Sequence, residues 1–137
     1  MIGLSNKTIY AMAALYQLGL LNRGERLKIR EIAERADAPQ KFLEQILLEL
    51  KKNGVLNSTK GANGGYILAK SMNEITLKEV IGILENNAFD EICQTENGIL
   101  KMFWEERQTE IVKVLDIPLS VLDSYQEKIN KNFNYII

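Results

Sequence analysis

The chain has 137 residues, of which 46% are hydrophobic and 26% are charged, and its formal net charge at pH 7 is -1. That length fits one domain, or one small domain with an appended segment, and the apolar content excludes a chain that is disordered throughout. No apolar run approaches the roughly 18 residues of a membrane-spanning helix, and the first residues do not resemble a signal peptide. A single cysteine cannot form an internal disulfide, which favours the reducing cytoplasm. Together with the lack of a long apolar run, this leads us to expect a cytoplasmic protein without membrane contact.

The sequence contains no histidine and one cysteine, Cys93. A Ser–His or Cys–His pair for nucleophilic catalysis is therefore impossible, and a structural zinc site lacks its usual ligands. No pattern of carboxylates resembles a glycosidase or a metal site. We expect neither enzymatic activity nor a bound metal ion.

The charges are divided unevenly along the chain. Residues 1–70 contain 11 Lys and Arg against 6 Asp and Glu, a net +5, whereas residues 71–137 contain 6 against 12, a net -6. A basic half favours contact with a polyanion such as nucleic acid. Chance distribution over solvated helix faces would give the same split, so the charge alone does not decide between the two interpretations.

The first helix is predicted over residues 4–21, where apolar side chains recur at helical spacing. Ser5 is a candidate N-cap, because its hydroxyl can accept a hydrogen bond from a backbone N–H that has no partner within the helix. Residues 26–29 alternate polar and apolar side chains, which is typical of a very short strand.

Two further helices are predicted over residues 29–36 and 40–53, separated by a tight break. Pro39 fits the first position of the later helix, because its fixed φ suits a helix start. That helix is amphipathic, and its apolar face consists of Leu43, Ile46, Leu47 and Leu50. Two helices joined by a tight turn are typical of a helix-turn-helix, although small helical bundles contain such pairs as well.

The stretch STKGANGGYILAK occupies residues 58–70, and β-like runs at residues 55–56 and 66–68 flank its turn. Asn63-Gly64 predicts a hairpin turn, because both residues tolerate positive φ. A hairpin directly after two such helices is the wing of a winged helix-turn-helix. A nucleotide-binding loop is not favoured, because such a loop ends in Lys-Ser or Lys-Thr and leads into a helix.

The C-terminal part is predicted to be helical. Thr76 and Glu79 form a capping box at the start of a short helix. A long helix is predicted over residues 98–115, and Pro118 can start a last helix that ends near Lys131, before an apolar tail. The long helix is too apolar to stand alone in solvent, so it either packs on its own domain or pairs with a second copy.

These segments, in this order, resemble the Rrf-type family of bacterial transcription regulators, which includes the iron–sulfur regulator IscR and the cysteine-metabolism regulator CymR. The segments that carry the resemblance are Leu4-Ser5-x-Lys7-x-x-Tyr10-Ala11, Ile32-Ala33-Glu34-Arg35, Phe42-Leu43-Glu44-Gln45-Ile46-Leu47, Leu50-Lys51-Lys52-Asn53-Gly54, Lys60-Gly61-x-x-Gly64-Gly65-Tyr66-x-Leu68-Ala69 and Ile75-Thr76-Leu77. The resemblance covers nearly the whole chain and is strongest over residues 4–85.

The resemblance implies a mainly α (α+β) fold, in which a winged helix-turn-helix carries a long C-terminal dimerisation helix. The expected division is a DNA-binding domain over residues 1–85, a linker or sensor loop over residues 86–97, and dimerisation helices with a tail over residues 98–137. It also implies a homodimer that binds double-stranded DNA at a palindromic operator and usually represses transcription.

Twelve residues are expected to contact DNA, from the resemblance and from their chemistry. They are Ser5, Lys7, Tyr10, Lys28, Gln40, Lys41, Glu44, Gln45, Lys60, Gly61, Asn63 and Gly64. Glu44 and Gln45 lie off the apolar face of their helix, where Glu can accept from cytosine N4 and Gln can pair with adenine. The alternatives are a solvated surface acid for Glu44 and an N-cap alone for Ser5. Ile9 stands where the family often has a basic residue, which removes one candidate contact to the DNA backbone.

Many members of the family bind a [2Fe-2S] cluster through three cysteines between the fourth helix and the long helix. This chain has only Cys93 in that segment, and one thiolate cannot hold a cluster that takes four protein ligands. We therefore expect no iron–sulfur cluster. Cys93 is a candidate redox or alkylation sensor, although its acidic neighbours disfavour the thiolate, and the alternative is a small semi-buried apolar side chain. An effector protein or a small molecule is a further candidate signal.

One other function remains open from the sequence: a winged-helix module that binds a protein, or a partner-dependent regulator with little DNA binding of its own. The basic residues of the predicted DNA surface favour the sequence-specific DNA-binding regulator.

Overall fold

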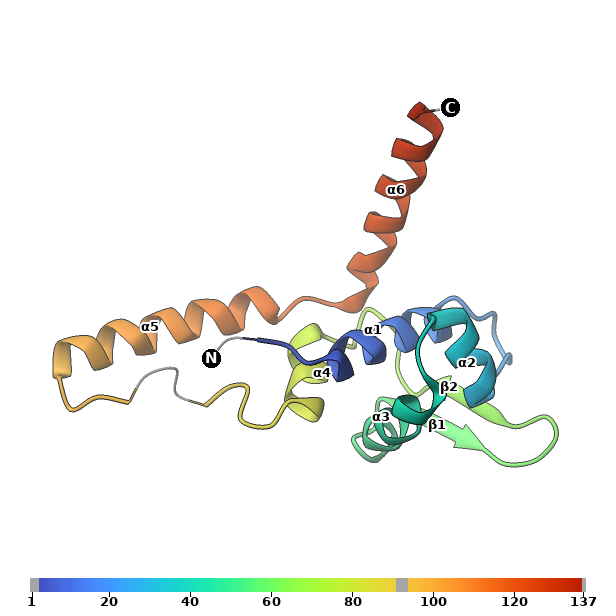
Figure 1. The fold of residues 1–137 in the computed structure, drawn as a ribbon, viewed down its shortest axis with the longest axis horizontal. Coiled ribbons are helices and arrows are strands. Elements are labelled where there is room, and N and C mark those ends of the chain that lie inside the picture. Colours follow the sequence, from blue (N-terminus) through green and yellow to red (C-terminus); the bar gives the residue numbers. More distant parts are fainter. Residues whose placement is uncertain (1–2, 91–93, 137) are drawn as a thin grey trace.

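The computed structural model describes residues 3–90 and 94–136 (Figure 1). In this part of the chain, six α-helices and one 3₁₀ helix accompany a two-stranded sheet. The elements in chain order are α1 (Asn6–Gly19), α2 (Ile29–Ala36), α3 (Gln40–Lys52), β1 (Leu56–Thr59), β2 (Gly65–Leu68), α4 (Leu77–Leu84), α5 (Gly98–Leu115), η1 (Leu119–Val121) and α6 (Leu122–Ile136). The predicted fold class, mainly helical with a small hairpin, is confirmed.

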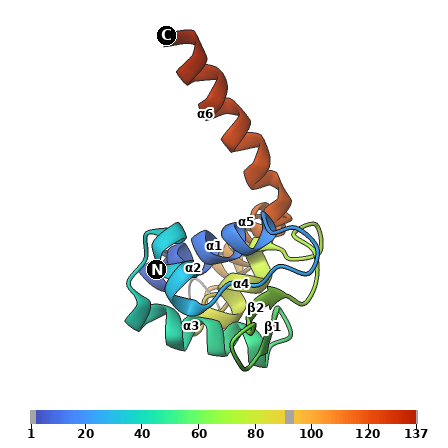
Figure 2. The ribbon, with the colours of Figure 1, turned by 90° about the vertical axis from the view of Figure 1, so that its right-hand side faces the viewer.

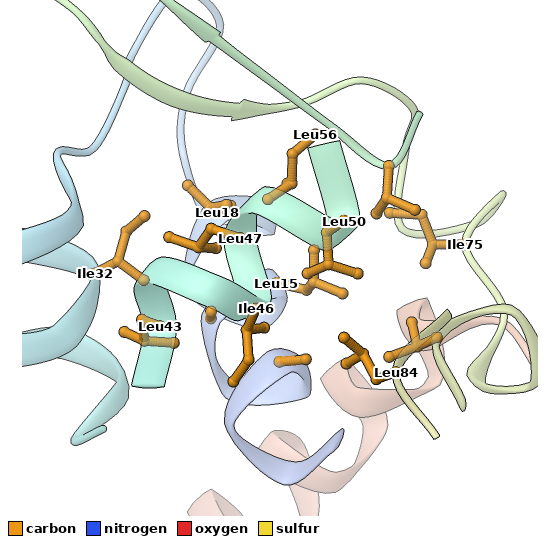
Figure 3. Packing of buried hydrophobic residues seen from close by; sticks show 14 of the residues in the cluster. Leu15, Leu18, Ile32, Leu43, Ile46, Leu47, Leu50, Leu56, Ile75 and Leu84 are labelled. Atoms are coloured by element: carbon orange, nitrogen blue, oxygen red, sulfur yellow. The ribbon is translucent and has the colours of Figure 1, made fainter. Parts of the chain in front are cut away.

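One hydrophobic core joins α1, α2, α3 and α4 (Figure 3). The residues with fully buried side chains include Leu15, Ile32, Leu43, Leu47, Leu50, Leu56 and Ile75. All four apolar residues predicted on the face of α3 have exposed fractions of no more than 2%. Because they recur at i, i+3, i+4 and i+7, their burial turns the other side of α3 to solvent.

The turn between α2 and α3 is set by its backbone conformation. Asp37 adopts the left-handed conformation (φ 50°, ψ 50°) after α2, and Ala38 is buried in the core. Pro39 is the N-cap of α3, with an extended backbone (φ -62°, ψ 127°), so the helix begins at Gln40, as in the predicted range, and Pro39 lies one position before the first helical position expected for it. The ring fixes φ near this value in either position, so the N-cap accommodates proline without strain.

The predicted hairpin is confirmed, with β1 and β2 paired antiparallel along their whole lengths. Its turn differs from the prediction. Residues 60–64 form the loop, in which the Gly64 N–H donates to the Gly61 carbonyl at 3.0 Å. The left-handed φ angles belong to Gly61 (103°) and Gly65 (150°), and not to Asn63 and Gly64. A loop of this length closes around a β-turn and does not need the two consecutive positive φ angles of a two-residue hairpin.

A third segment pairs with the hairpin at one position. The Leu27 N–H donates to the Tyr66 carbonyl at 3.2 Å, and the Tyr66 N–H donates to the Leu27 carbonyl at 2.7 Å. A Cβ on Gly65 would lie 2.6 Å from the Leu27 carbonyl oxygen, so this approach requires glycine. The short strand predicted over residues 26–29 is therefore a single bridge, which ties the connection before α2 to the wing.

The connection between α5 and α6 is anchored in the core. Leu119 is buried there, and its N–H donates to the Ile75 carbonyl at 2.8 Å, while the Leu77 N–H donates to the Ile117 carbonyl at 2.9 Å. On either side of this anchor, α5 and α6 extend away from the helical core (Figures 1 and 2). No residue of α5 is buried in the chain.

The last helix is longer than predicted. We expected it to end near Lys131, before an apolar tail from Asn132, but α6 continues to Ile136. Neither proline nor glycine occurs between these positions, so nothing in the sequence stops the helix.

Candidate nucleic-acid interface

The helix α3 turns its polar side outward. Four predicted contact residues on it are exposed: Gln40, Lys41, Glu44 and Gln45. Leu43, which separates the two pairs in sequence, is fully buried and fixes the rotation of the helix. The Gln45 side-chain amide donates to the Glu49 carboxylate at 3.0 Å, and this bond engages one of the two N–H groups of the amide.

A groove of about 680 Å³ lies between the first turns of α1 and α3 and the end of α4. Predicted contact residues from both helices line it: Ser5, Lys7, Tyr10, Lys41 and Gln45. The rings of Tyr10 and Phe42 stack with centroids 6.1 Å apart and planes 15° from parallel. The structure thus brings the beginnings of two helices, α1 and α3, onto one surface.

Ser5 caps α1 as predicted and has a second role. Its hydroxyl oxygen accepts from the Lys7 N–H at 3.3 Å. Its own O–H and N–H donate to Glu85 Oε1 at 2.6 and 2.8 Å, and the Thr8 hydroxyl donates to the same oxygen at 2.8 Å. These bonds, led by that from the Ser5 side chain, hold the pKa of the Glu85 carboxyl below its ordinary value, although burial acts in the opposite direction.

The wing carries four further predicted contacts, none of which lines this groove. Lys60, Gly61 and Asn63 are exposed in the loop of the hairpin, whereas Gly64 is buried, and a Cβ there would lie 2.3 Å from the Thr59 carbonyl oxygen. Gly64 can therefore act only through its backbone. In Figure 1, α3 lies between the N-terminal end of α1 and the tip of this loop.

The lysines predicted to contact DNA come from α1, the segment before α2, α3 and the wing loop. Lys28 precedes α2, and its N–H donates to Glu31 at 3.0 Å while its side chain is exposed. Within residues 3–90 and 94–136, no carboxylate forms an ion pair with Lys7, Lys28, Lys41 or Lys60, whereas Lys70 pairs with Glu79 at 2.6 Å. Unpaired cations beside an exposed helix face provide sequence-independent attraction for a phosphate backbone.

Comparison with known protein families identifies the family of this chain. Residues 4–123 match the family model described as Rrf2, iron-dependent transcriptional regulator. The chain belongs to the Rrf2 family. This confirms the resemblance seen in the sequence and the prediction that the protein is no enzyme, because the members of this family are DNA-binding transcription regulators.

Two solved structures are similar to this Rrf2 protein. IscR of T. potens is 30% identical with a TM-score of 0.75, and the match covers 93% of this chain and 90% of that one. CymR (YrzC), described as the global cysteine regulator of B. subtilis, is 27% identical with a TM-score of 0.79, covering 91% and 98%. Among sequences, IscR of Pectobacterium carotovorum is 34% identical over 95 residues, which are 69% of this chain but only 58% of that protein.

The family description includes iron, and the donor set of this Rrf2 chain does not fit a cluster. Iron–sulfur clusters take four Cys, or two Cys and two His, whereas this sequence contains one cysteine and no histidine. Among the described residues, no group of three or more His, Cys, Asp or Glu is arranged to hold a metal ion. Cys93, the candidate sensor, lies outside the described residues. In the same described part, no helix has the length and apolar character needed to cross a membrane.

Sequence reasoning missed two residues of this surface: Phe42, which lines the groove, and Glu85, which bonds to Ser5 beside it. Glu85 bonds to Ser5 across 80 positions, and no local pattern marks that pairing. Phe42 is half-exposed, with 56% of its surface accessible, although a large aromatic residue at a helix start reads as a core residue. A helical wheel of α3 could have found Phe42, because it lies off the apolar face.

Proposed function

We propose that this Rrf2 protein is a sequence-specific DNA-binding repressor that acts as a homodimer on a palindromic operator. The observation that carries the proposal is the outward face of α3, where Glu44 and Gln45 are exposed beside Lys41, which forms no ion pair among the described residues. Gln reads adenine and Glu reads cytosine in the major groove, while lysines contact phosphates. Repression follows when the occupied operator overlaps a promoter.

The wing would complete the contact with DNA. The residues Lys60, Gly61 and Asn63 are exposed in the loop of the wing, and in Figure 1 α3 lies between the tip of this loop and the N-terminal end of α1. A lysine in the loop of such a hairpin suits a phosphate or the minor groove. DNA-bound α3 would then be flanked by phosphate contacts from Lys7 on one side and Lys60 on the other.

The proposed homodimer would form through α5 and α6. α5 exposes large apolar side chains, with exposed fractions of 83% at Ile99, 65% at Met102 and 74% at Val114. α6 exposes Tyr125, Ile129 and Phe133 in the same way. A second copy would bury these faces, and its two-fold axis would match a palindromic operator.

The function is tested by selecting DNA from a random pool with the purified chain and measuring binding of the enriched duplex as salt is varied. We expect a palindromic sequence whose affinity falls steeply with salt. Weak binding that does not discriminate between sequences would reject the proposal and favour a winged-helix module that binds another protein.

The homodimer is tested separately by light scattering on the wild type and on Met102→Glu. We expect a mass of two chains for the wild type and of one chain for the variant, because a buried carboxylate without a partner is costly. Lys101→Glu, which places a new carboxylate at an exposed, already charged position of the same helix, is the control. A wild type that remains monomeric at all concentrations would reject the dimer.

We further propose that the protein works in the cytoplasm and that it carries no iron–sulfur cluster. We also propose a division into a DNA-binding domain over residues 1–85, a linker over residues 86–97, and dimerisation helices with a tail over residues 98–137. A protein or small molecule would then supply the signal, with Cys93 as the candidate redox site. A visible absorption spectrum of anaerobically purified protein tests the first point, since charge-transfer bands would contradict it.

A further inference from the structure

Glu85 ends α4 and connects it to the first turn of α1. One of its carboxylate oxygens, Oε1, accepts hydrogen bonds from the Ser5 N–H, the Ser5 hydroxyl and the Thr8 hydroxyl, at 2.8, 2.6 and 2.8 Å. Hydrogen bonds to an ionised acceptor are about twice as strong as neutral ones. The N-terminal end of α1 is thus held by one side chain that comes from a different helix.

This contact is not a loose surface pairing. Thr8 is completely buried, with an exposed fraction of 0%, so its hydroxyl has Glu85 as a fixed partner beneath the surface. The carboxylate also lies at the positive end of α1, where an anion is favoured by the helix dipole. The pKa of Glu85 is lowered, first by the Ser5 hydroxyl, which agrees with a carboxylate that stays ionised there.

The first turn of α1, which Glu85 holds in place, contains residues that are proposed to bind DNA phosphates. The Ser5 hydroxyl, while donating to Glu85, also accepts from the Lys7 N–H at 3.3 Å. The orientation of the Ser5 side chain, and through it the backbone of Lys7, therefore depends on Glu85. Both residues line the groove that Lys41 of α3 borders, so a shift of this turn changes the spacing between the two helix starts.

We propose that Glu85 is a positioning residue for DNA binding: it sets the first turn of α1 against α3 so that Ser5, Lys7 and Lys41 meet one phosphate backbone. This inference rests on the proposed function. Glu85 itself does not contact DNA. It acts through Ser5 and Thr8.

The place of Glu85 in the chain gives this role a regulatory consequence. Asn86, the next residue, lines the same groove. Three positions further on, the Phe89 carbonyl accepts from the Gln108 side chain of α5 at 2.8 Å, and a Cβ on Gly82 of α4 would lie 3.5 Å from the Phe89 ring. A displacement of α5 or of the segment after α4 would reach Ser5 through Glu85.

Glu85→Gln is the central experiment, because positioning and simple charge predict opposite signs. Removing a negative charge near DNA should strengthen binding slightly if charge alone matters. Losing the charged acceptor should weaken it about tenfold if Glu85 positions Ser5, since hydrogen bonds to charged groups contribute that much. The probe is the duplex enriched by the wild-type chain. The slope of log affinity against log salt concentration should become shallower by about one, the amount expected for the loss of one phosphate contact.

Glu74→Gln is the matched control. Glu74 also accepts from a serine hydroxyl, that of Ser71 at 3.1 Å, and the substitution removes the same charge from the connection before α4. We expect its affinity to be unchanged or slightly raised. An affinity for Glu85→Gln that equals or exceeds that of the control would overturn the inference.

Thr8→Val provides a second variant in case Glu85→Gln does not fold. It keeps the shape of a fully buried side chain and removes one of the three donors to Glu85. Thr8 is buried and cannot contact DNA. Weaker DNA binding by the folded variant must therefore result from a change in the first turn of α1. Unchanged binding by folded Thr8→Val and folded Glu85→Gln would overturn the inference, even if both melt at lower temperature.

The same measurements separate the two proposals. A wild-type chain that binds no duplex specifically rejects the proposed function, and the role of Glu85 in DNA binding falls with it. A wild type that binds specifically, with variants that bind equally well, rejects the role of Glu85 alone.

In a Ser5→Ala background, Glu85→Gln should cause a smaller further loss of DNA affinity than in the wild type, because the effect passes through Ser5.

Discussion

Tyr10 of α1 and Phe42 of α3 stack at the groove between the two helices, with ring centroids 6.1 Å apart and planes 15° from parallel. More than half of the Phe42 surface remains exposed, at 56%, so burial explains only part of its presence. The stack joins the two helix starts at the level where Lys7 and Lys41 line the groove. The stack therefore joins the two helices that carry the proposed phosphate contacts.

Phe42→Ala should lower the free energy of unfolding by about 1 kcal/mol, the contribution of an aromatic pair that is partly exposed. Urea denaturation of the variant and wild type measures this loss. Leu48→Ala is the control, because Leu48 is an exposed apolar residue of the same helix, at 42%. Equal losses for the two variants would show that the ring stack contributes nothing of its own.

The helices of the DNA-binding part could be predicted because their signals are local. The apolar spacing of Leu43, Ile46, Leu47 and Leu50 predicted which side of α3 is buried, and Ser5 was recognised as a cap. These features depend on residues within one or two turns of each other.

The remaining features depend on residues far apart in the chain. The bond between Ser5 and Glu85 spans 80 positions. The left-handed φ of Gly65 arises with the close approach of Leu27, a segment that precedes α2. Sequence reasoning identified the turn residues by type and assigned the special backbone angles to the wrong pair, because tertiary contact decided where the chain bends.

Gly65→Ala should destabilise the protein by more than about 1 kcal/mol. The new Cβ would lie 2.6 Å from the Leu27 carbonyl oxygen, and φ is 150°, a region that other residues rarely adopt. Thermal unfolding followed by circular dichroism measures the effect. Gly98→Ala is the matched control, since nothing lies within 4 Å of a Cβ there, and it should leave the melting temperature unchanged or raised. Equal melting temperatures for the two variants would contradict the bridge to Leu27.

The stability contribution of Glu85 should depend on pH. Its folded-state pKa is lowered from 4.5, first by the Ser5 hydroxyl, so the folded state favours the ionised carboxyl. This contribution is fully present above the ordinary pKa and is lost as pH falls through the folded-state pKa. The wild type should thus melt higher than Glu85→Gln near neutral pH, and the difference should shrink in acid. A difference that is constant or larger in acid would mean that ionisation of Glu85 does not stabilise the fold.

Gln45 and Lys60 should affect DNA binding in different ways. Gln45→Ala should relax sequence preference at one base position and weaken operator binding by about 1–3 kcal/mol, because the lost contact is to a base edge. Lys60→Ala should weaken binding similarly on all sequences and reduce the salt slope by about one, because a phosphate contact carries no sequence information.

Competition of the enriched duplex with single-base variants separates these effects of Gln45 and Lys60. Glu49→Gln is a control for Gln45, since it alters the residue that holds the Gln45 amide at 3.0 Å without removing the proposed reader. It should keep the base preference of the wild type. A Gln45→Ala variant that retains full discrimination at every position, while Lys60→Ala loses it at one, would exclude α3 as the reader of sequence and assign that role to the wing.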